Sequence, residues 1–448
     1  MTVYGAIVYY PGEIERTSAI MAKRKFSVNE SFEVVGAFWN LESPDQKFTG
    51  TLASKDGKLT LTSAPTYTTI DFANPAERAA LFLSGSGLLK RAGNFCGFTP
   101  EGDCTLVEAI KLREGGITDM STGRKVETQE YRVSAAVMGL HLESSEAKAI
   151  DSAAFYFTKI HQWLPIPWSM TMGKDGNTFV APSKANEVFR FRNAPLGAEV
   201  FCQVFAGGGA KFRKSAKVKS VARIRVVPEH PQSLEWFDSI AFRLENFLTL
   251  CIGTSVSLKK LQFFCGEEDG WLVHKVRRRE EKVNFQAWLQ TSPSAIASAL
   301  DKWLAVPDDN RPVETTVLGI LRKSTVFVET EFLSLAQALE GFNRIQGGGS
   351  KTFAERIREI LDLLSADFSL KLVGQRDEFV RKVVETRNYF THLGIPPKGS
   401  VVQGTGDIFD INQRLHALLR CVMLIQLGIP EAELQAPILY QATKWKSY

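Results

Sequence analysis

Three strongly hydrogen-bonding side chains occur close together near the end of a helical segment. The stretch ETRNYFTHLG covers residues 385–394 and contains Arg387, Asn388 and His392. Arginine carries a planar fork of donors that suits phosphate, and histidine can transfer a proton near neutral pH. A phosphate clamp beside a proton-transfer group is the chemistry that cleavage of RNA by its own 2′-hydroxyl requires.

A single helix is predicted over residues 371–393, and it positions these side chains. Gly394 stops the helix, and two prolines follow. Arg387 lies four residues after Val383, and Asn388 lies four residues after Val384, so both are predicted to fall on the apolar stripe. A polar or charged group on a packing face is costly unless it is paired or functional. Two interpretations therefore stay open: a structural pair of arginine with an acid, or a functional site.

The length and composition of the chain are those of a globular protein with more than one domain. The chain has 448 residues, of which 44% are apolar and 23% are charged, with a net charge of +5. A charge this small neither requires nor excludes a polyanionic partner. The six cysteines show no Cys-x-x-Cys spacing and no disulfide framework, so we expect reduced thiols.

The sequence predicts a cytoplasmic protein without a membrane segment, a metal or a cofactor. The first residues, MTVYGAIVYYPGEIER, lack the basic segment and long apolar run of a signal peptide. No uncharged apolar stretch of about 18 residues occurs. The six histidines are too far apart in the sequence to indicate a zinc site.

The pattern along the chain predicts an α+β multidomain fold. An antiparallel β-rich, sandwich-like domain is expected over residues 1–229, with a hairpin at SKDGKL, and an all-helical domain over residues 230–448. The helical domain is expected to begin with a helix that ends at Gly253 and a hairpin that turns at EEDG. Further helices are predicted over residues 294–305, 311–345, 352–366, 371–393 and 407–427.

One strand of the β-rich domain is strongly basic. Lys217 and Lys219, like Arg223 and Arg225, alternate along the chain as one face of a strand would. The simpler interpretation is a solvated face. The alternative is a surface that contacts RNA phosphates.

A glycine-rich stretch, QGGGSKT, spans residues 346–352 and superficially resembles a phosphate-binding loop. Ser350 stands where such a loop requires glycine before its lysine, and the stretch follows a helix rather than a strand. We therefore predict a flexible connection.

The spacing of Arg387, Asn388 and His392 resembles the signature of HEPN ribonucleases. The flanking segments are similar to helices of the ApeA-like HEPN group. The β-rich first half, including GKLTLTS and FTKIHQWL, is similar to the N-terminal domain that accompanies it. The similar helical segments are ENFLTLCIG (245–253), EFLSLAQALEGF (331–342) and LHALLRCVMLIQLGI (415–429).

The resemblance implies a metal-independent endoribonuclease that works as a homodimer or an even-numbered oligomer. Two copies of the Arg–His motif would form one composite site that cleaves cellular RNA, with tRNA as a candidate substrate. Glu340 would be either a supporting acid or an ordinary surface glutamate. ApeA proteins are implicated in bacterial defence against phage by abortive infection, so the N-terminal domain would sense a phage product or silence the nuclease.

Two other functions stay open from the sequence. One is a non-catalytic HEPN protein that binds nucleotides or a partner, although a pure binding module has no need of the histidine. The other is a structural β-sandwich ligand binder with a helical dimerisation tail. Digestion of labelled RNA by the purified protein distinguishes all three.

Overall fold

A computed structural model shows two compact units in this protein. The first unit contains residues 1–141 and 270–274, and the second contains residues 142–269 and 275–448. For some described residues, 206–211 and 215–220 among them, only the backbone is described. The structure describes residues 24–69, 90–118, 124–164, 169–173, 176–180, 186–211, 215–273, 289, 291–306, 312–322, 327–347, 349–392 and 404–443.

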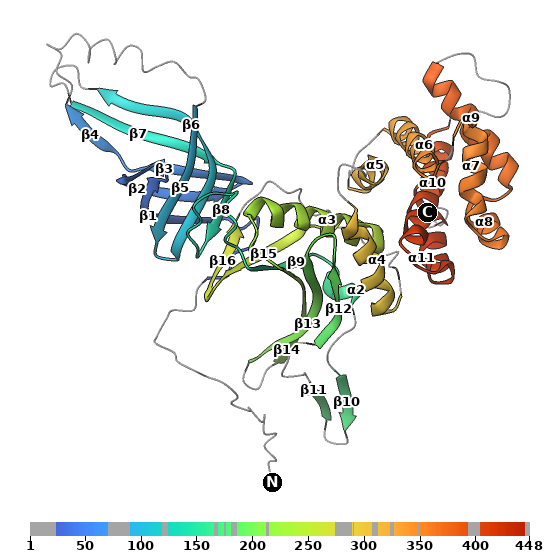
Figure 1. Ribbon diagram of the computed structural model, residues 1–448, viewed down its shortest axis with the longest axis horizontal. Helices are drawn as coiled ribbons and strands as arrows, with labels where there is room; N and C mark the ends of the chain where they lie inside the picture. The colour runs from blue at the N-terminus through green and yellow to red at the C-terminus, as the bar shows by residue number, and fades with distance from the viewer. Residues whose placement is uncertain are drawn as a thin grey trace. The chain divides into compact units, whose positions relative to one another are not determined.

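The strands of the first unit pair antiparallel, and six of them close on themselves (Figure 1). In order, β1 pairs with β2, β2 with β3, β3 with β7, β7 with β6, β6 with β5, and β5 with β1. This closure removes free edges from those strands. The strands of this unit are β1 Phe32–Asn40, β2 Ser43–Lys55, β3 Lys58–Ser63, β4 Thr66–Thr69, β5 Lys90–Thr99, β6 Gly102–Thr118, β7 Arg124–Val133 and β8 Ala135–Met138.

Local sequence explains the β2–β3 hairpin of this unit. Asp56 and Gly57 both have positive φ, at 52° and 71°, which is the backbone of a two-residue hairpin turn, so the predicted hairpin is confirmed. In β3, Leu59 and Leu61 are fully buried while the residue between them is not, as alternation requires.

The second unit contains an antiparallel sheet that is covered on one face by a helix. The strands lie in the order β12 (Asn186–Asn193), β13 (Ala198–Lys211), β14 (Ser215–Pro228), β9 (Ser152–Phe157) and β15 (Leu258–Cys265). Helix α3 (Leu234–Ile252) packs on this sheet, with the ring of Phe237 6.5 Å from that of Phe155 and 6.0 Å from that of Phe263. The unit also contains α2 (Ile160–Trp163), α4 (Pro293–Ala305) and a separate hairpin, β10 (Ser169–Gly173) and β11 (Gly176–Val180).

The predicted fold class is confirmed: an antiparallel β-rich N-terminal region precedes a helical C-terminal region. The sheet continues past residue 230, however, because β15 and β16 (Glu268–Val273) follow α3 and pair with β9 and β8. The hairpin between them turns at Gly266 and Glu267, slightly earlier than expected. The division into domains at residue 230 stays a prediction.

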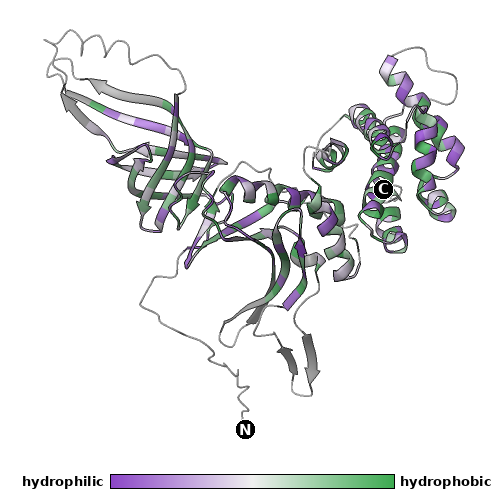
Figure 2. Cartoon of the chain, viewed as in Figure 1, coloured by the Kyte–Doolittle hydropathy of each residue, from purple (hydrophilic) through white to green (hydrophobic). Residues whose placement is uncertain are grey.

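Seven helices of the described C-terminal ranges form the last part of the second unit. Helix α10 lies among them and packs against α6, α8 and α11. Figure 2 shows hydrophobic and hydrophilic residues along α10, and hydrophilic residues are frequent on α7 and α9. The helices are α5 Pro312–Leu321, α6 Val328–Ile345, α7 Phe353–Asp362, α8 Ala366–Val373, α9 Arg376–His392, α10 Thr405–Gln426 and α11 Glu431–Thr443.

The single helix predicted over residues 371–393 is wrong. Gly374 ends α8 with φ 79° and ψ −144°, a conformation that favours glycine, and α9 begins at Arg376. The predicted helix 311–345 is likewise two helices, α5 and α6. In both cases the helical spacing of apolar residues continues across the interruption, so this spacing alone does not reveal the break between the two helices.

Arg420 joins α10 to the C-terminal end of α3. Its side chain is fully buried and donates hydrogen bonds to the carbonyl oxygens of Leu250 (2.6 Å) and Cys251 (2.7 Å) and to Gln441 Oε1 (2.9 Å). Burial lowers the pKa of Arg420 to about 10. The first two bonds satisfy carbonyls that the end of a helix leaves without intrahelical partners.

Gly253 makes room for that arginine. It ends α3 with φ 73°, as predicted, and a Cβ there would lie 2.5 Å from Arg420 Nη1. Among the helices in the described ranges, none is long and apolar enough to cross a bilayer.

Candidate active site

Helix α9 carries the three candidate residues in its last turns. Its buried residues are Phe379, Val380, Val383 and Thr386, and the stripe continues to Phe390, whose ring lies 6.2 Å from that of Phe332 in α6.

The prediction that Arg387 and Asn388 lie on the packing stripe is therefore wrong. The packing positions continue from Val383 to the buried Thr386 and the half-buried Phe390, three and seven residues on, and this places Arg387 at the margin of the stripe. The Arg387 side chain is 35% exposed, and Asn388 and His392 are exposed. In one chain, the motif is thus open to solvent.

Side chains from three helices hold the Arg387 guanidinium. Its Nη2 lies 3.6 Å from Glu340 Oε2 of α6, and its carbon lies 5.6 Å from the centre of the Phe353 ring of α7. Its Nη1 also donates a hydrogen bond of 3.3 Å to Asn388 Oδ1. The fork is thus held in place while part of it still reaches solvent.

The structure places Glu340 beside the motif, where the sequence left its role open. Its carboxylate also pairs with Arg344 of the same helix at 2.6 Å, and its side chain is 22% exposed. One carboxylate therefore lies between two guanidinium groups, so the arrangement keeps net positive charge. A supporting role for Glu340 in the site stays a prediction.

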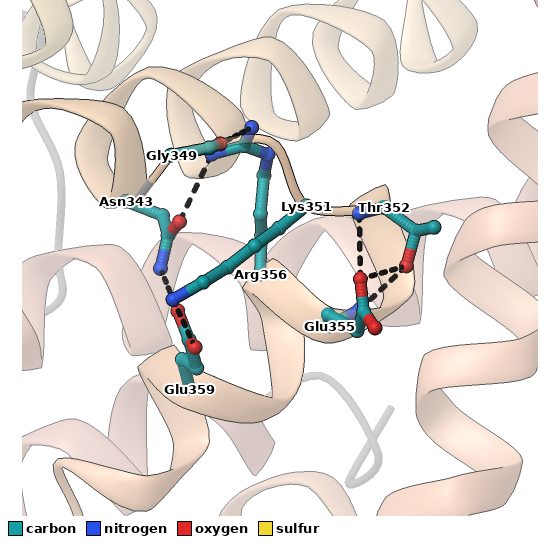
Figure 3. A network of polar contacts seen from close by, with 7 residues as sticks. All are labelled: Asn343, Gly349, Lys351, Thr352, Glu355, Arg356 and Glu359. Carbon is teal, nitrogen blue, oxygen red and sulfur yellow. Dashed lines mark hydrogen bonds and ion pairs between the residues drawn. The ribbon is translucent and has the colours of Figure 1, made fainter. Parts of the chain in front are cut away.

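Phe353 is the residue of this site that sequence reasoning missed. It is the first residue of α7, directly after Thr352, which forms a capping box with Glu355: the side chain of each residue accepts a hydrogen bond from the backbone N–H of the other (Figure 3). The sequence TFAE carries that signature, so the start of the helix could have been predicted. The proximity of Phe353 to Arg387 could not have been predicted from the sequence.

The glycine-rich connection before α7 contacts side chains of that helix. Arg356 of α7 donates to the carbonyl oxygen of Gly349 (2.8 Å) and to Asn343 Oδ1 (3.0 Å). Asn343 in turn donates to Glu359, which also pairs with Lys351 (Figure 3). The connection thus has contacts with α7 at Gly349 and Lys351, and its flexibility stays a prediction.

Comparison with protein families accounts for both halves of the chain. Residues 33–305 match the model of ApeA N-terminal domain 1, which is more than half of the chain. The chain belongs to the ApeA family. Residues 333–433 match the Apea-like HEPN model, and this range contains Glu340, Arg387, Asn388 and His392.

These two ApeA-family matches suggest an antiphage-defence protein with a HEPN domain, a domain family whose members are generally ribonucleases. No curated protein and no solved structure matches the chain. The match to the N-terminal domain extends over α3, β15, β16 and α4, so the ApeA N-terminal domain contains helices as well as strands.

The predicted basic face of this ApeA-family chain lies on β14. The register places Lys217, Lys219, Arg223 and Arg225 on one face of the strand. The side chains of Lys217 and Lys219 lie outside the described part of the chain, and both arginines are partly buried. RNA binding by the four residues stays a prediction.

The cysteines and the possible metal ligands of the described ranges were the other candidates for chemistry. They contain no group of three or more His, Cys, Asp or Glu residues placed to hold a metal ion. All six cysteines are free, and five are buried. Burial raises the pKa of Cys104 and of Cys251 to about 12, which makes these thiols poor nucleophiles.

Proposed function

We propose that this protein is a metal-independent HEPN endoribonuclease that cleaves cellular RNA in antiphage defence by abortive infection. The observation that supports this most directly is the position of Arg387, Asn388 and His392. They lie within the residues that match the HEPN model, in the last turns of α9, with side chains that reach solvent.

His392 and Arg387 would divide the chemistry between them. His392 accepts the proton of a 2′-hydroxyl, and the 2′-oxygen attacks the adjacent phosphorus while the bond to the 5′-oxygen breaks. Arg387 binds the non-bridging oxygens and stabilises their charge. Asn388, which accepts a hydrogen bond from Arg387, orients the guanidinium. The products are a 2′,3′-cyclic phosphate and a 5′-hydroxyl.

The active form would be a homodimer or an even-numbered oligomer. The reaction needs a base for the 2′-hydroxyl and an acid for the leaving 5′-oxygen, and the motif of one chain holds a single histidine. Because Asn388 and His392 are exposed in one chain, a second copy can bring its own Arg387 and His392 to the same phosphate. HEPN domains generally act as dimers on RNA, in agreement with this arrangement.

The remaining parts of the proposal rest on family resemblance. The substrate is structured RNA, with tRNA as the first to test, and the protein acts in the cytoplasm. The β-rich N-terminal domain, residues 1–229, either senses a phage product or ligand or holds the HEPN domain, residues 230–448, inactive.

Digestion of end-labelled RNA by purified protein tests the proposal. Wild type should give products with 2′,3′-cyclic phosphate ends, and His392→Ala should give none. Arg381→Ala is the matched control because Arg381 is exposed on the same helix outside the motif. If His392→Ala is as active as wild type, the assignment is wrong. If wild type binds RNA without cutting it, with or without phage lysate, the non-catalytic HEPN alternative holds.

A further inference from the structure

Two arginines lie side by side on the face of the second unit's sheet that α3 does not cover. Arg223 and Arg225 are two residues apart on β14, so their side chains leave the same face. Ile224 between them points to the other face, where it is buried opposite Phe155, a contact of α3. Both arginines are partly buried rather than fully solvated.

Neutral groups hold both guanidinium groups. Arg223 donates from Nε and Nη2 to Gln203 Oε1, at 3.0 and 2.9 Å, and lies 4.6 Å from the centre of the Phe205 ring. Arg225 donates from Nη2 to the hydroxyl of Ser152 at 3.0 Å and lies 4.5 Å from the centre of the Phe264 ring. The forks are therefore oriented without help from a carboxylate.

Other arginines on this face are neutralised, and these two are not. Arg190 pairs with Glu199 at 2.8 Å and Arg192 with Glu229 at 2.5 Å, both at exposed positions of β12. Within the described ranges, neither Arg223 nor Arg225 forms an ion pair. Of these four arginines, the two partly buried ones are thus those that form no ion pair within the described ranges.

The pair carries an electrostatic cost that a bound anion would relieve. Burial, and then the neighbouring Arg223, lower the pKa of Arg225. The Nε of Arg225 is buried and has no hydrogen-bond acceptor in the described part of the chain. A buried donor without an acceptor is unfavourable, and two adjacent like charges repel each other.

We propose that Arg223 and Arg225 bind the phosphate group of a nucleotide. The two guanidinium groups start about 6–7 Å apart along one strand and are oriented by their neighbours, so both can reach a single phosphate. Apolar surface for a base lies beside them: Phe205 is partly buried, and Val221, its cross-strand partner on the same face, is 40% exposed. The site lies on β14, outside the HEPN motif, and does not depend on the ribonuclease proposal.

Calorimetric titration of the full-length protein tests this site with three probes: adenosine monophosphate, inorganic phosphate and adenosine. We expect the monophosphate to bind best, inorganic phosphate more weakly, and adenosine not detectably. Arg225→Gln and Arg223→Gln should each weaken binding of the monophosphate about 10- to 100-fold, because each removes a charge-assisted donor pair. Arg192→Gln is the matched control and should bind as wild type does, because Arg192 is exposed and paired with Glu229.

Three results would overturn the proposal. The first is equal affinity of wild type and both glutamine variants for the monophosphate. The second is adenosine binding as tightly as the monophosphate. The third is a single-stranded RNA that binds through these arginines when neither small phosphate does. Arg223→Lys keeps the charge but loses the fork, so it should also weaken binding, and it replaces Arg223→Gln if that variant is unfolded by circular dichroism.

Discussion

Replacing Arg387 with alanine separates a catalytic role of this side chain from a structural one. The expected loss of folding stability is small. The ion pair with Glu340 has an N–O distance of 3.6 Å, and its side chains are 35% and 22% exposed, so it contributes at most about 1 kcal/mol after solvent screening. The contact with the Phe353 ring adds about 0.5–1 kcal/mol. The unfolding free energy should therefore fall by no more than about 2 kcal/mol, which leaves the protein folded.

The expected catalytic loss is larger. If Arg387 stabilises the charge on the phosphate oxygens, its removal should slow RNA cleavage by about 10²–10³-fold, equivalent to about 2.7–4 kcal/mol of transition-state stabilisation. The assay is the single-turnover rate of cleavage of labelled RNA at saturating protein. Urea unfolding of the same preparations gives the stability of each variant.

Arg344→Ala is the matched control for this experiment. Arg344 also pairs with the carboxylate of Glu340, at 2.6 Å, but it lies on α6, four residues after Glu340, and its side chain is 63% exposed. Its cleavage rate should stay within about threefold of wild type, since such pairs contribute about 0.3–0.5 kcal/mol. The reasoning fails if Arg344→Ala and Arg387→Ala slow cleavage equally. It also fails if Arg387→Ala cleaves at the wild-type rate while folded.

Three further outcomes are expected. EDTA should leave the rate of RNA cleavage unchanged; a loss that Mg²⁺ or Mn²⁺ restores would indicate a metal-dependent site instead. On dilution below the dimer dissociation constant, cleavage should fall faster than in proportion to protein concentration, as sedimentation shows dimers giving way to monomers; a fully active monomer would contradict the composite site. Arg420→Met should lower the unfolding free energy by about 3–5 kcal/mol in urea, because the carbonyls of Leu250 and Cys251 lose their buried donor. Arg414→Gln, on the same helix, should cost under about 1 kcal/mol because its pair with Asp410 is partly exposed, and equal losses in the two variants would show that the buried contacts of Arg420 do not matter.

Features that depend on neighbouring residues could be predicted from the sequence. The Asp56–Gly57 hairpin and the end of α3 at Gly253 are examples, because positive φ and helix termination are properties of a few consecutive residues. The order of β-rich and helical regions follows from periodicity in the same way. The ApeA-like resemblance is also a property of sequence, and the family matches confirm it.

Features that depend on which distant segments meet could be decided only by the tertiary structure. The closing of the first sheet rests on β6 pairing with both β5 and β7, and alternation within a strand does not specify its partners. The prediction failed at Gly374 because the apolar period is the same on both sides of a break. For Arg387, helical spacing indicated a packing position, but its exposure was decided by how α6 and α7 lie against α9.

The same limit applies to charge. The sequence shows that Arg223 and Arg225 alternate along β14, and only the arrangement of strands shows that Gln203, Ser152 and two phenylalanines surround them instead of carboxylates. Spacing along a strand determines from which face of the sheet a side chain projects. Which residues contact that face is decided by packing between segments tens of residues apart. Burial and electrostatic partners depend on distances in the folded protein and not on the order of residues in the sequence.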